Sequence, residues 1–129
     1  MVYKGKYKII NNLITACDYD FVLLEIEKAI KNKKSLLISP IASHTLVKAY
    51  YDRNLKEILD RFDFLVPDSQ WVKRAIWFLY GKRLKERVYG PELMLKVSQL
   101  AQKKGYKIFL YGNKKEVLMR LKERLKRLY

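Results

Sequence analysis

The chain has 129 residues, half of them hydrophobic, and its 28 Lys and Arg against 13 Asp and Glu give a net charge of +15. Length and composition predict one globular domain that buries its own core, and they exclude a disordered chain. No apolar run approaches the ~20 residues that cross a bilayer, the first residues lack the apolar segment of a signal peptide, and the single Cys17 excludes an internal disulfide or a cysteine-based zinc site, so a cytoplasmic protein is expected.

The N-terminal part of the sequence begins with a strand pattern and continues with a helix pattern. Residues 7–15 predict one or two short strands, broken by a turn at Asn11-Asn12. Asp18 then opens a predicted helix that runs to about Asn32, with apolar residues recurring along one face.

A second strand-then-helix unit follows. Residues 35–39 (SLLIS) form a continuous apolar run that is typical of a buried strand, and Pro40 is expected to stop it. Ser43 is placed to cap the next helix, and Asn54 is placed to open another. Two short helices are therefore predicted between this strand and the one that comes after it.

The middle of the chain repeats the order. Residues 62–66 predict a strand, and the segment from Ser69 to Tyr80 predicts a helix that Gly81 ends. Residues 84–89 (LKERVY) alternate charged and apolar side chains and predict a further strand.

The C-terminal part contains the last predicted unit. Gly90-Pro91 begins a helix that ends at Gly105, because proline is favoured at the first helical position and glycine just past the last. Residues 106–111 then predict a strand, and Asn113 is expected to cap a final amphipathic helix.

Strands separated by helices predict an α/β fold, with a mostly parallel, Rossmann-like sheet flanked by helices in a single domain. In such sheets ligands bind outside the carboxyl ends of the strands. No G-x-G-x-x-G or Walker A sequence is present, so neither a dinucleotide fold nor a P-loop is supported. Four strand-to-helix turns are therefore the candidate ligand site: 39–43, 67–69, 89–91 and 112–113.

Asp68 is the one carboxylate in these turns. It precedes a predicted helix, so it can be a helix cap. It also ends a buried strand, so it can present a carboxylate to a ligand. Spacing alone leaves both interpretations open, just as it leaves Arg87 open between a surface position and a ligand contact.

Longer stretches carry a family resemblance. Residues 66–117 (VPDSQWVKRAIWFLYGKRLKERVYGPELMLKVSQLAQKKGYKIFLYGNKKEV) resemble the WecG/TagA/CpsF family of bacterial glycosyltransferases, whose shared pattern reads approximately PDG, then ERV-x-G-x-DLM, then IFLLGG. Upstream, NNLITACDYDFVLLEIEKAI and ISPIASHTLVKAYYDRNLKEIL are similar to the opening elements of that family. The run RVYGPELM, combined with PD at the right separation, is its most specific part.

The resemblance implies an activity. Family members transfer N-acetylmannosamine, or a related sugar, from a UDP-sugar to the 4-hydroxyl of GlcNAc on a polyprenyl-diphosphate lipid. They invert the anomeric centre and work at the cytoplasmic membrane face, in teichoic acid or surface polysaccharide synthesis. The resemblance implies no cofactor and no metal, and the absence of a D-x-D pair agrees with that.

The resemblance also implies roles for individual residues. Asp68 matches the proposed general base, and Ser39 matches a substrate-contacting Thr. Arg87, Tyr89 and Gly90 lie in the R-V-x-G motif and are expected to bind substrate. Gly112 and Asn113 match the glycine pair of the later strand and are also expected to bind substrate.

Two departures from the family pattern affect this expectation. Ser69 and Asn113 stand where the family has glycine. Family members are also roughly twice as long as this chain, and the further half carries a second substrate motif and a basic, membrane-docking appendage. The chain is therefore expected to hold an incomplete site and to have little activity alone. Three alternatives stay open, namely an excised fragment, a truncated paralogue and one half of a split enzyme, and a second copy or a partner chain is a candidate to supply the missing half.

The uneven charge leaves other functions open. Residues 63–129 carry 17 basic and 6 acidic residues, a surface that attracts nucleic acid, an anionic membrane face or a phosphate-bearing substrate. No RNP, KH, zinc-finger or helix-turn-helix signature is present, so nucleic acid is not expected as a partner. Two alternative functions stay open. The first is a truncated, non-catalytic subunit or a split-enzyme subunit, and the second, which is less favoured, is a basic nucleic-acid-binding domain.

Overall fold

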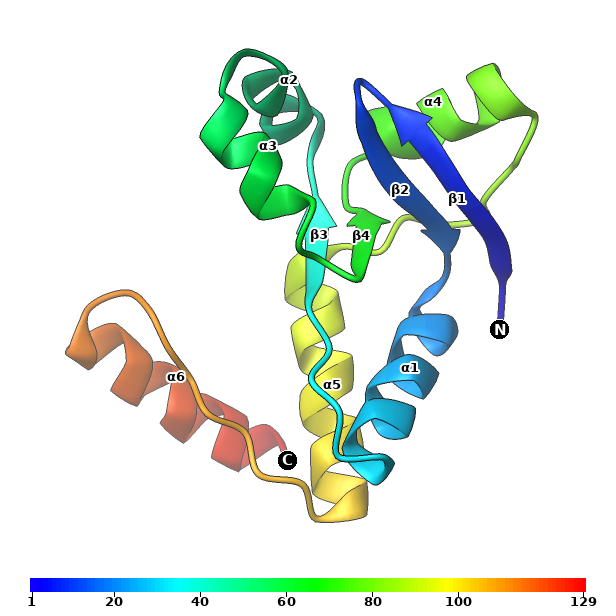
Figure 1. The fold of residues 1–129 in the computed structure, drawn as a ribbon. Coiled ribbons are helices and arrows are strands. Elements are labelled where there is room, and N and C mark those ends of the chain that lie inside the picture. Colours follow the sequence, from blue (N-terminus) through cyan, green and yellow to red (C-terminus); the bar gives the residue numbers. More distant parts are fainter. The chain divides into compact units, whose positions relative to one another are not determined.

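The computed structural model of the chain describes residues 1–129 (Figure 1). The chain divides into two compact units, Met1–Leu93 and Met94–Tyr129. No helix is both long enough and apolar enough to cross a bilayer. The elements in chain order are β1 (Tyr3–Ile9), β2 (Asn12–Cys17), α1 (Tyr19–Lys31), β3 (Ile38–Ile41), α2 (Ser43–Tyr51), α3 (Arg53–Leu59), β4 (Phe64–Pro67), α4 (Gln70–Tyr80), α5 (Gly90–Lys104) and α6 (Lys115–Leu128).

Strands β1 and β2 form the predicted hairpin. They pair antiparallel, with Tyr7 opposite Ile14 and Ile9 opposite Asn12. The turn consists of Ile10 and Asn11, both at positive φ, so it lies one residue earlier than predicted and Asn12 already begins β2. Positive φ suits an asparagine but is strained for a β-branched isoleucine.

Strands β3 and β4 form the only parallel pair. Ser39 lies opposite Leu65 and Ile41 opposite Pro67, and β2 lies against β4. Strand β3 runs from 38 to 41 where 35–39 was predicted, and β4 runs from 64 to 67 where 62–66 was predicted, so both strands begin and end later than predicted. Pro40 does not stop β3, because a strand with one free edge tolerates a residue that lacks the N–H donor.

The prediction of a strand at 84–89 is wrong. A strand would place Leu84, Glu86 and Val88 on one face, yet Leu84 and Val88 are buried while Glu86 is exposed. The segment is irregular, and one backbone hydrogen bond, from Val88 N–H to the Pro67 carbonyl at 2.8 Å, connects it to the end of β4. Glu86 interrupts the two-residue repeat of buried apolar side chains that a half-buried strand requires.

The prediction of a strand at 106–111 is wrong as well. The segment is extended, but no strand pairs with it. A strand exists only where a neighbouring backbone receives its N–H and C=O groups. The mixed α/β class is therefore confirmed, whereas the structure has two separate two-stranded sheets in place of the larger parallel sheet.

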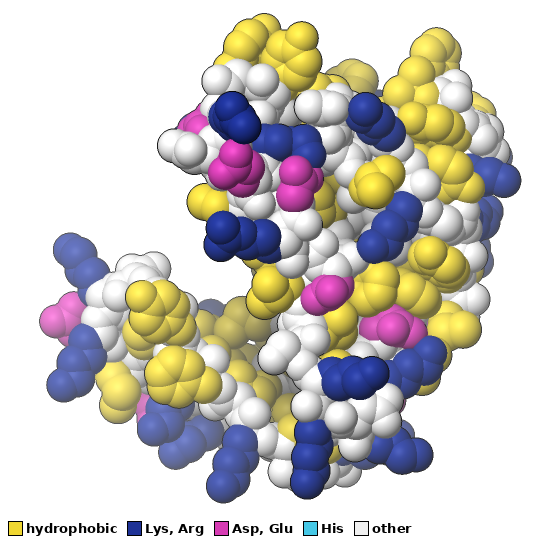
Figure 2. Space-filling model, viewed as in Figure 1, with side chains coloured by type: hydrophobic (Ala, Val, Ile, Leu, Met, Phe, Trp, Pro, Cys, Tyr) yellow, Lys and Arg dark blue, Asp and Glu magenta, His cyan; other side chains and the backbone are white.

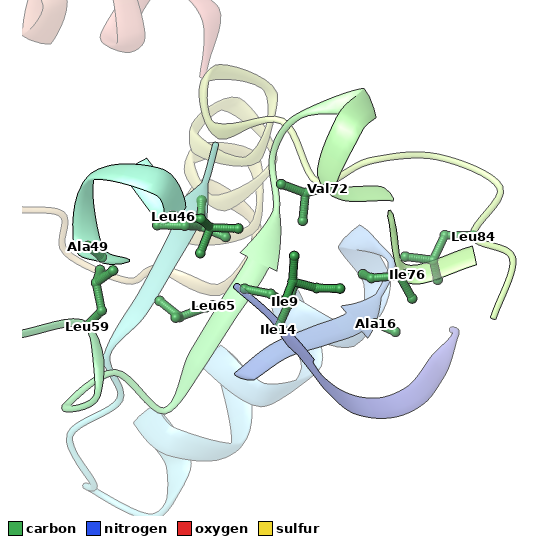
Figure 3. Close-up of a cluster of buried hydrophobic side chains, with 11 residues drawn as sticks. Ile9, Ile14, Ala16, Leu46, Ala49, Leu59, Leu65, Val72, Ile76 and Leu84 are labelled. Carbon is green, nitrogen blue, oxygen red and sulfur yellow. The ribbon is translucent and has the colours of Figure 1, made fainter. Parts of the chain in front are cut away.

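The hydrophobic core of residues 1–93 lies between the strands and helices α2, α3 and α4 (Figure 3). Strand β2 contributes Ile14, which is fully buried, and α4 contributes Val72 and Ile76 from one face. The members that Figure 3 labels are Ile9, Ile14, Ala16, Leu46, Ala49, Leu59, Leu65, Val72, Ile76 and Leu84. This core fixes the ends of β3 and β4, from which the candidate site is built.

Helix termini show where local signals were sufficient. Asp18 caps α1 by accepting from Phe21 N–H at 3.0 Å, and Gly81, in the left-handed region, ends α4, both as predicted. Gly90 begins α5, and Gly105 follows its last residue. Three predicted caps are wrong: the N-cap residues of α2, α3 and α6 are Ala42, Asp52 and Lys114 in place of Ser43, Asn54 and Asn113.

Candidate functional site

Three of the four predicted turns meet where β3 and β4 end and α5 begins. A Cβ atom built on Gly90 would lie 3.5 Å from Pro40 Cγ and 3.7 Å from Asp68 Oδ1. The parallel pairing brings the strand ends together, because Asp68 N–H donates to the Ile41 carbonyl at 3.1 Å. The turns at 39–43, 67–69 and 89–91 therefore form one cluster at the carboxyl edge of the small sheet.

Asp68 is not the cap of α4. That role belongs to Ser69, whose hydroxyl accepts from Val72 N–H at 3.2 Å. The Asp68 carboxylate instead accepts from Gly90 N–H at 2.7 Å, through Oδ1, while Oδ2 has no hydrogen-bond partner. Asp68 is partly exposed, so this second oxygen is available to another group.

The first N–H groups of α5 are held by two side chains. Tyr19 Oη accepts from Tyr89 N–H at 2.9 Å and donates to Glu92 Oε2 at 3.1 Å, and Asp68 takes the next N–H, that of Gly90. The helix dipole makes this end of α5 positive, and the Asp68 carboxylate lies against it through the Gly90 hydrogen bond. Burial of the Tyr19 phenol raises its pKa, and the neighbouring Glu92 carboxylate adds to the rise.

Sequence reasoning missed Tyr19 and Glu92. Glu92 carried a usable signal, because it occupies the third position of α5, where a glutamate commonly reaches back to the N-cap N–H. Here the N-cap N–H belongs to Tyr89, and the Tyr19 hydroxyl lies between it and the glutamate. Tyr19 is 70 residues from Tyr89, so no local pattern indicated it.

Arg87 and Tyr89 lie together beside this cluster. The Arg87 guanidinium is 4.5 Å from the centre of the Tyr89 ring, which is close enough for a cation–π interaction. Arg87 forms no ion pair, and Tyr89 is 40% exposed. An arginine without a carboxylate partner, two residues before Tyr89, is suited to bind an anionic group.

The other predicted substrate-binding residues, Ser39, Gly112 and Asn113, lie in different parts of the structure. Ser39 lies in β3 with its hydroxyl 3.3 Å from the Pro40 carbonyl, next to the cluster in sequence. Gly112 and Asn113 belong to the second unit, where both residues have positive φ and Asn113 Oδ1 accepts from Lys114 N–H. Their participation in the site stays a prediction.

A hollow of the first unit lies apart from this cluster. It has a volume of about 550 Å³, its lining includes Lys6, Lys56, Asp60 and Asp63, and it contains neither Asp68 nor Arg87. Two of its three lysines have partners, since Lys56 pairs with Asp60 and Lys6 donates to the Asp63 carbonyl. No three His, Cys, Asp or Glu side chains converge as metal ligands would. The Asp68 cluster combines a carboxylate oxygen without a partner, Asp68 Oδ2, with an arginine that forms no ion pair, Arg87.

Comparisons with known proteins agree with the resemblance in the sequence. The pattern of the glycosyl transferase WecG/TagA/CpsF family matches residues 7–129. A curated relative from Bacillus subtilis (strain 168), N-acetylglucosaminyldiphosphoundecaprenol N-acetyl-beta-D-mannosaminyltransferase, is 31% identical over 109 residues. The match covers 84% of this chain and 40% of that relative, so the chain spans well under half of the relative's length.

Proposed function

The chain belongs to the glycosyl transferase WecG/TagA/CpsF family, and from that premise we propose that it supplies the general base of an inverting sugar transferase. The proposed donor is UDP-N-acetylmannosamine or a related UDP-sugar. The proposed acceptor is GlcNAc on a polyprenyl diphosphate, because the relative is named for an acceptor of that kind. The observation that carries the proposal is the Asp68 carboxylate, held by Gly90 N–H at 2.7 Å with Oδ2 unpaired.

The chemistry requires one base and one positive group. In the proposed step Asp68 Oδ2 takes the proton from the acceptor hydroxyl as that oxygen bonds to the anomeric carbon. The bond from that carbon to the diphosphate breaks at the same time, and UDP leaves. Because the Gly90 hydrogen bond fixes Oδ1, the orientation of Oδ2 is set before substrate arrives.

Arg87 and the start of α5 support the departure of UDP. A guanidinium stabilises the charge that develops on a leaving diphosphate, and Arg87 has no carboxylate competing for it. The Tyr89 ring beneath Arg87 holds its guanidinium in place. We propose that metal is not required, that Ser39, Tyr89, Gly112 and Asn113 contact substrate, and that the acceptor lipid places the reaction at the membrane face.

The direct test uses the protein at its natural length, with a UDP-N-acetylmannosamine donor and a short-chain polyprenyl-diphosphate GlcNAc acceptor. We expect Asp68→Asn to lower turnover by ~10²–10⁴ while donor binding and melting temperature change little, since the amide keeps the Gly90 contact but accepts no proton. Asp63→Asn is the matched control, because Asp63 also accepts a backbone N–H, that of Leu37 at 2.8 Å, at the start of β4. Equal turnover in both variants would remove Asp68 as the base.

Donor binding is tested separately on this chain. Titration with UDP, followed by NMR, is expected to shift the Gly90 amide, and Arg87→Gln is expected to weaken that response. Shifts confined to residues 114–128 would instead indicate anion binding by the lysines and arginines of α6, and would contradict the proposed donor site.

A further inference from the structure

Helix α4 turns a large aromatic surface toward solvent. Trp71 is 70% exposed, Trp77 54% and Phe78 87%, whereas Val72 and Ile76 on the opposite side are buried in the core. The spacing of 71, 74, 77 and 78 places these residues on one side of the helix. We name Trp71, Arg74, Trp77 and Phe78 the α4 outer face. Contiguous apolar surface of this kind marks an interaction site more often than a free surface.

The chain segment that carries the α4 outer face, residues 69–85, has positive charges only, and Asp68 and Glu86 flank it. Residues 69–85 contain five Lys and Arg and no Asp or Glu. The Arg74 guanidinium lies 5.6 Å from the centre of the Trp71 ring, and the Arg83 guanidinium 5.7 Å from that of Trp77. Neither arginine forms an ion pair. In Figure 2, hydrophobic side chains crowd the upper right, where α4 lies in Figure 1, with Lys and Arg along the adjoining edge.

A small basic hollow adjoins this face. Its volume is about 170 Å³, and it is lined by Lys73, Arg74, Trp77, Arg83 and Leu84. Three cations around one indole offer donors to phosphate oxygens, and no carboxylate of the chain pairs with them. Lys73 donates one hydrogen bond to the Lys85 carbonyl at 3.4 Å, and none of the three cations has a carboxylate partner. The face thus combines aromatic groups that can enter an apolar layer with cations that can bind an anion.

We propose that the α4 outer face and its basic hollow dock the chain on a bilayer that contains anionic phospholipid. Trp71, Trp77 and Phe78 would enter the interface between headgroups and acyl chains, where amphipathic aromatic rings are favoured. The hollow would bind a lipid phosphate through Lys73, Arg74 and Arg83. This inference rests on the proposed function for its choice of a membrane, and it locates the contact surface on the helix that follows Asp68.

Charge favours a bilayer over a second copy of the chain. A two-fold symmetric contact brings the same patch of both copies together, which would oppose Arg74 and Arg83 to their own counterparts with no carboxylate between residues 69 and 85. Nucleic acid shares the attraction to cations. It differs in using aromatic rings as stacking platforms along a groove that tracks its backbone, whereas these aromatic residues lie on the outer side of a helix.

The experiment uses the two tryptophans as probes, because the chain has only two and both lie in α4. Vesicles of phosphatidylcholine with 30% phosphatidylglycerol are expected to shift the tryptophan emission to the blue and to carry the protein down in sedimentation. Vesicles of phosphatidylcholine alone are expected to do neither, and soluble glycerol phosphate is expected to leave the emission unchanged. Quenching by brominated acyl chains is expected to reach these indoles.

Matched variants assign the binding to the named residues. Arg74→Gln/Arg83→Gln is expected to weaken partitioning about 30-fold, since each basic residue near an anionic surface contributes about 1 kcal/mol. The control Arg124→Gln/Arg127→Gln removes the same two charges from exposed positions of α6 and is expected to change partitioning much less. Phe78→Ser is expected to weaken it as well, whereas Tyr51→Ser, an exposed aromatic of α2, is not.

Each contrary outcome overturns the proposal. Binding without a blue shift, or equal loss in the α6 double variant, would mean that net charge and not the α4 outer face holds the vesicle. A blue shift produced equally by a single-stranded oligonucleotide would identify a nucleic-acid surface. Concentration-dependent dimerisation that Phe78→Ser abolishes would identify a contact between copies. A failed sugar-transfer assay would leave all of these results readable, because vesicle binding requires no turnover.

Discussion

Two apolar runs of similar composition, 62–67 and 106–111, have different structures. In the first, Leu65 and Val66 are buried, and β4 pairs with β3 while β2 lies against it. In the second, Phe109 is 87% exposed and Tyr111 92% exposed, and no strand pairs with the segment. The difference teaches that an apolar run alone does not make a strand, because a strand also needs a neighbouring backbone, and that backbone is distant in sequence.

Helices α4 and α6 differ in the same way. Both are amphipathic, but α4 has a side-chain cap and buries Val72 and Ile76, whereas α6 has no side-chain cap and no buried residue. The first unit is therefore stabilised by a shared core. The second unit is stabilised more by local helix formation, which is weaker because isolated helices of about this length are marginal in water.

The first prediction, which has the largest expected effect, compares how much one side-chain truncation destabilises each of the two units. We expect Ile76→Ala to lower the free energy of unfolding of the first unit by about 2–5 kcal/mol, because Ile76 is fully buried and the truncation leaves a cavity. Phe109→Ala is the matched truncation in the second unit. It is expected to change the free energy of unfolding of that unit by less than about 0.5 kcal/mol. Urea unfolding measures both effects, with the fluorescence of Trp71 and Trp77 reporting the first unit and far-ultraviolet circular dichroism reporting the helices of both units. Equal losses would mean that residues 106–111 share the core.

Local signals predicted the helices better than the sheet. Asp18, Gly81 and Gly105 act within a few residues of themselves, so the helix ends that they determine could be predicted from sequence. The failures at 84–89 and 106–111 share a physical cause, since the hydrogen bonds that define a strand come from another part of the chain. Sequence pattern alone does not show whether such a partner is present.

The second prediction compares the turn at 89–90, which is held by side chains, with the one at 112–113. We expect Tyr19→Phe to lower the free energy of unfolding by about 1–3 kcal/mol, because the ring stays while Tyr89 N–H loses its acceptor. The Tyr89 and Gly90 amide signals are expected to move in NMR spectra, and those of 112–113 are not. Tyr80→Phe is the control, since it removes an exposed hydroxyl that donates to the Lys8 carbonyl. Unmoved Gly90 signals would contradict a positioning role for Tyr19.

The candidate site also contains some residues that local sequence signals indicated and others that only the three-dimensional structure shows. The rule that ligands bind at strand ends indicated Asp68 and Gly90 from sequence, and the structure brings the two together at 2.7 Å. The same sequence pattern left Asp68 open as the cap of α4, because Asp68 and Ser69 are both capping residues and only geometry distinguishes them. Tyr19 could not be predicted, because its contact with Tyr89 spans 70 residues.

The third prediction tests the helix caps of α4 and α6. Ser69→Ala is expected to cost about 1 kcal/mol of stability, because Val72 N–H loses the hydroxyl that caps it. Lys114→Ala, at the equivalent position of α6, is expected to cost almost nothing, since Lys114 makes no side-chain cap. Thermal unfolding monitored by circular dichroism compares the two variants. A larger loss in Lys114→Ala would mean that α6 depends on contacts outside its own backbone.

The smallest expected effect concerns the negative charge of Asp18, the residue that caps α1. Helix α6 has no side-chain cap of this kind. Burial alone would raise the pKa of Asp18, but hydrogen bonds from the backbone N–H groups of Val2 and Phe21, with the positive amino group of Met1, hold that pKa below its usual range. A lowered pKa in the folded state means that the ionised carboxylate stabilises the fold above the unfolded pKa of about 3.9, and that this contribution is lost as pH falls through the folded value.

Asp18→Asn keeps the cap and removes the charge, so we expect it to be less stable than the parent by about 0.3–1 kcal/mol at pH 7 and equal to it near pH 2. Asp18→Ala removes the cap as well and is expected to stay about 1 kcal/mol below Asp18→Asn at every pH. Urea unfolding of the three proteins from pH 2 to pH 7 measures the differences, and a gap between parent and Asp18→Asn that does not close in acid would show that the carboxylate stabilises α1 by geometry and not by charge.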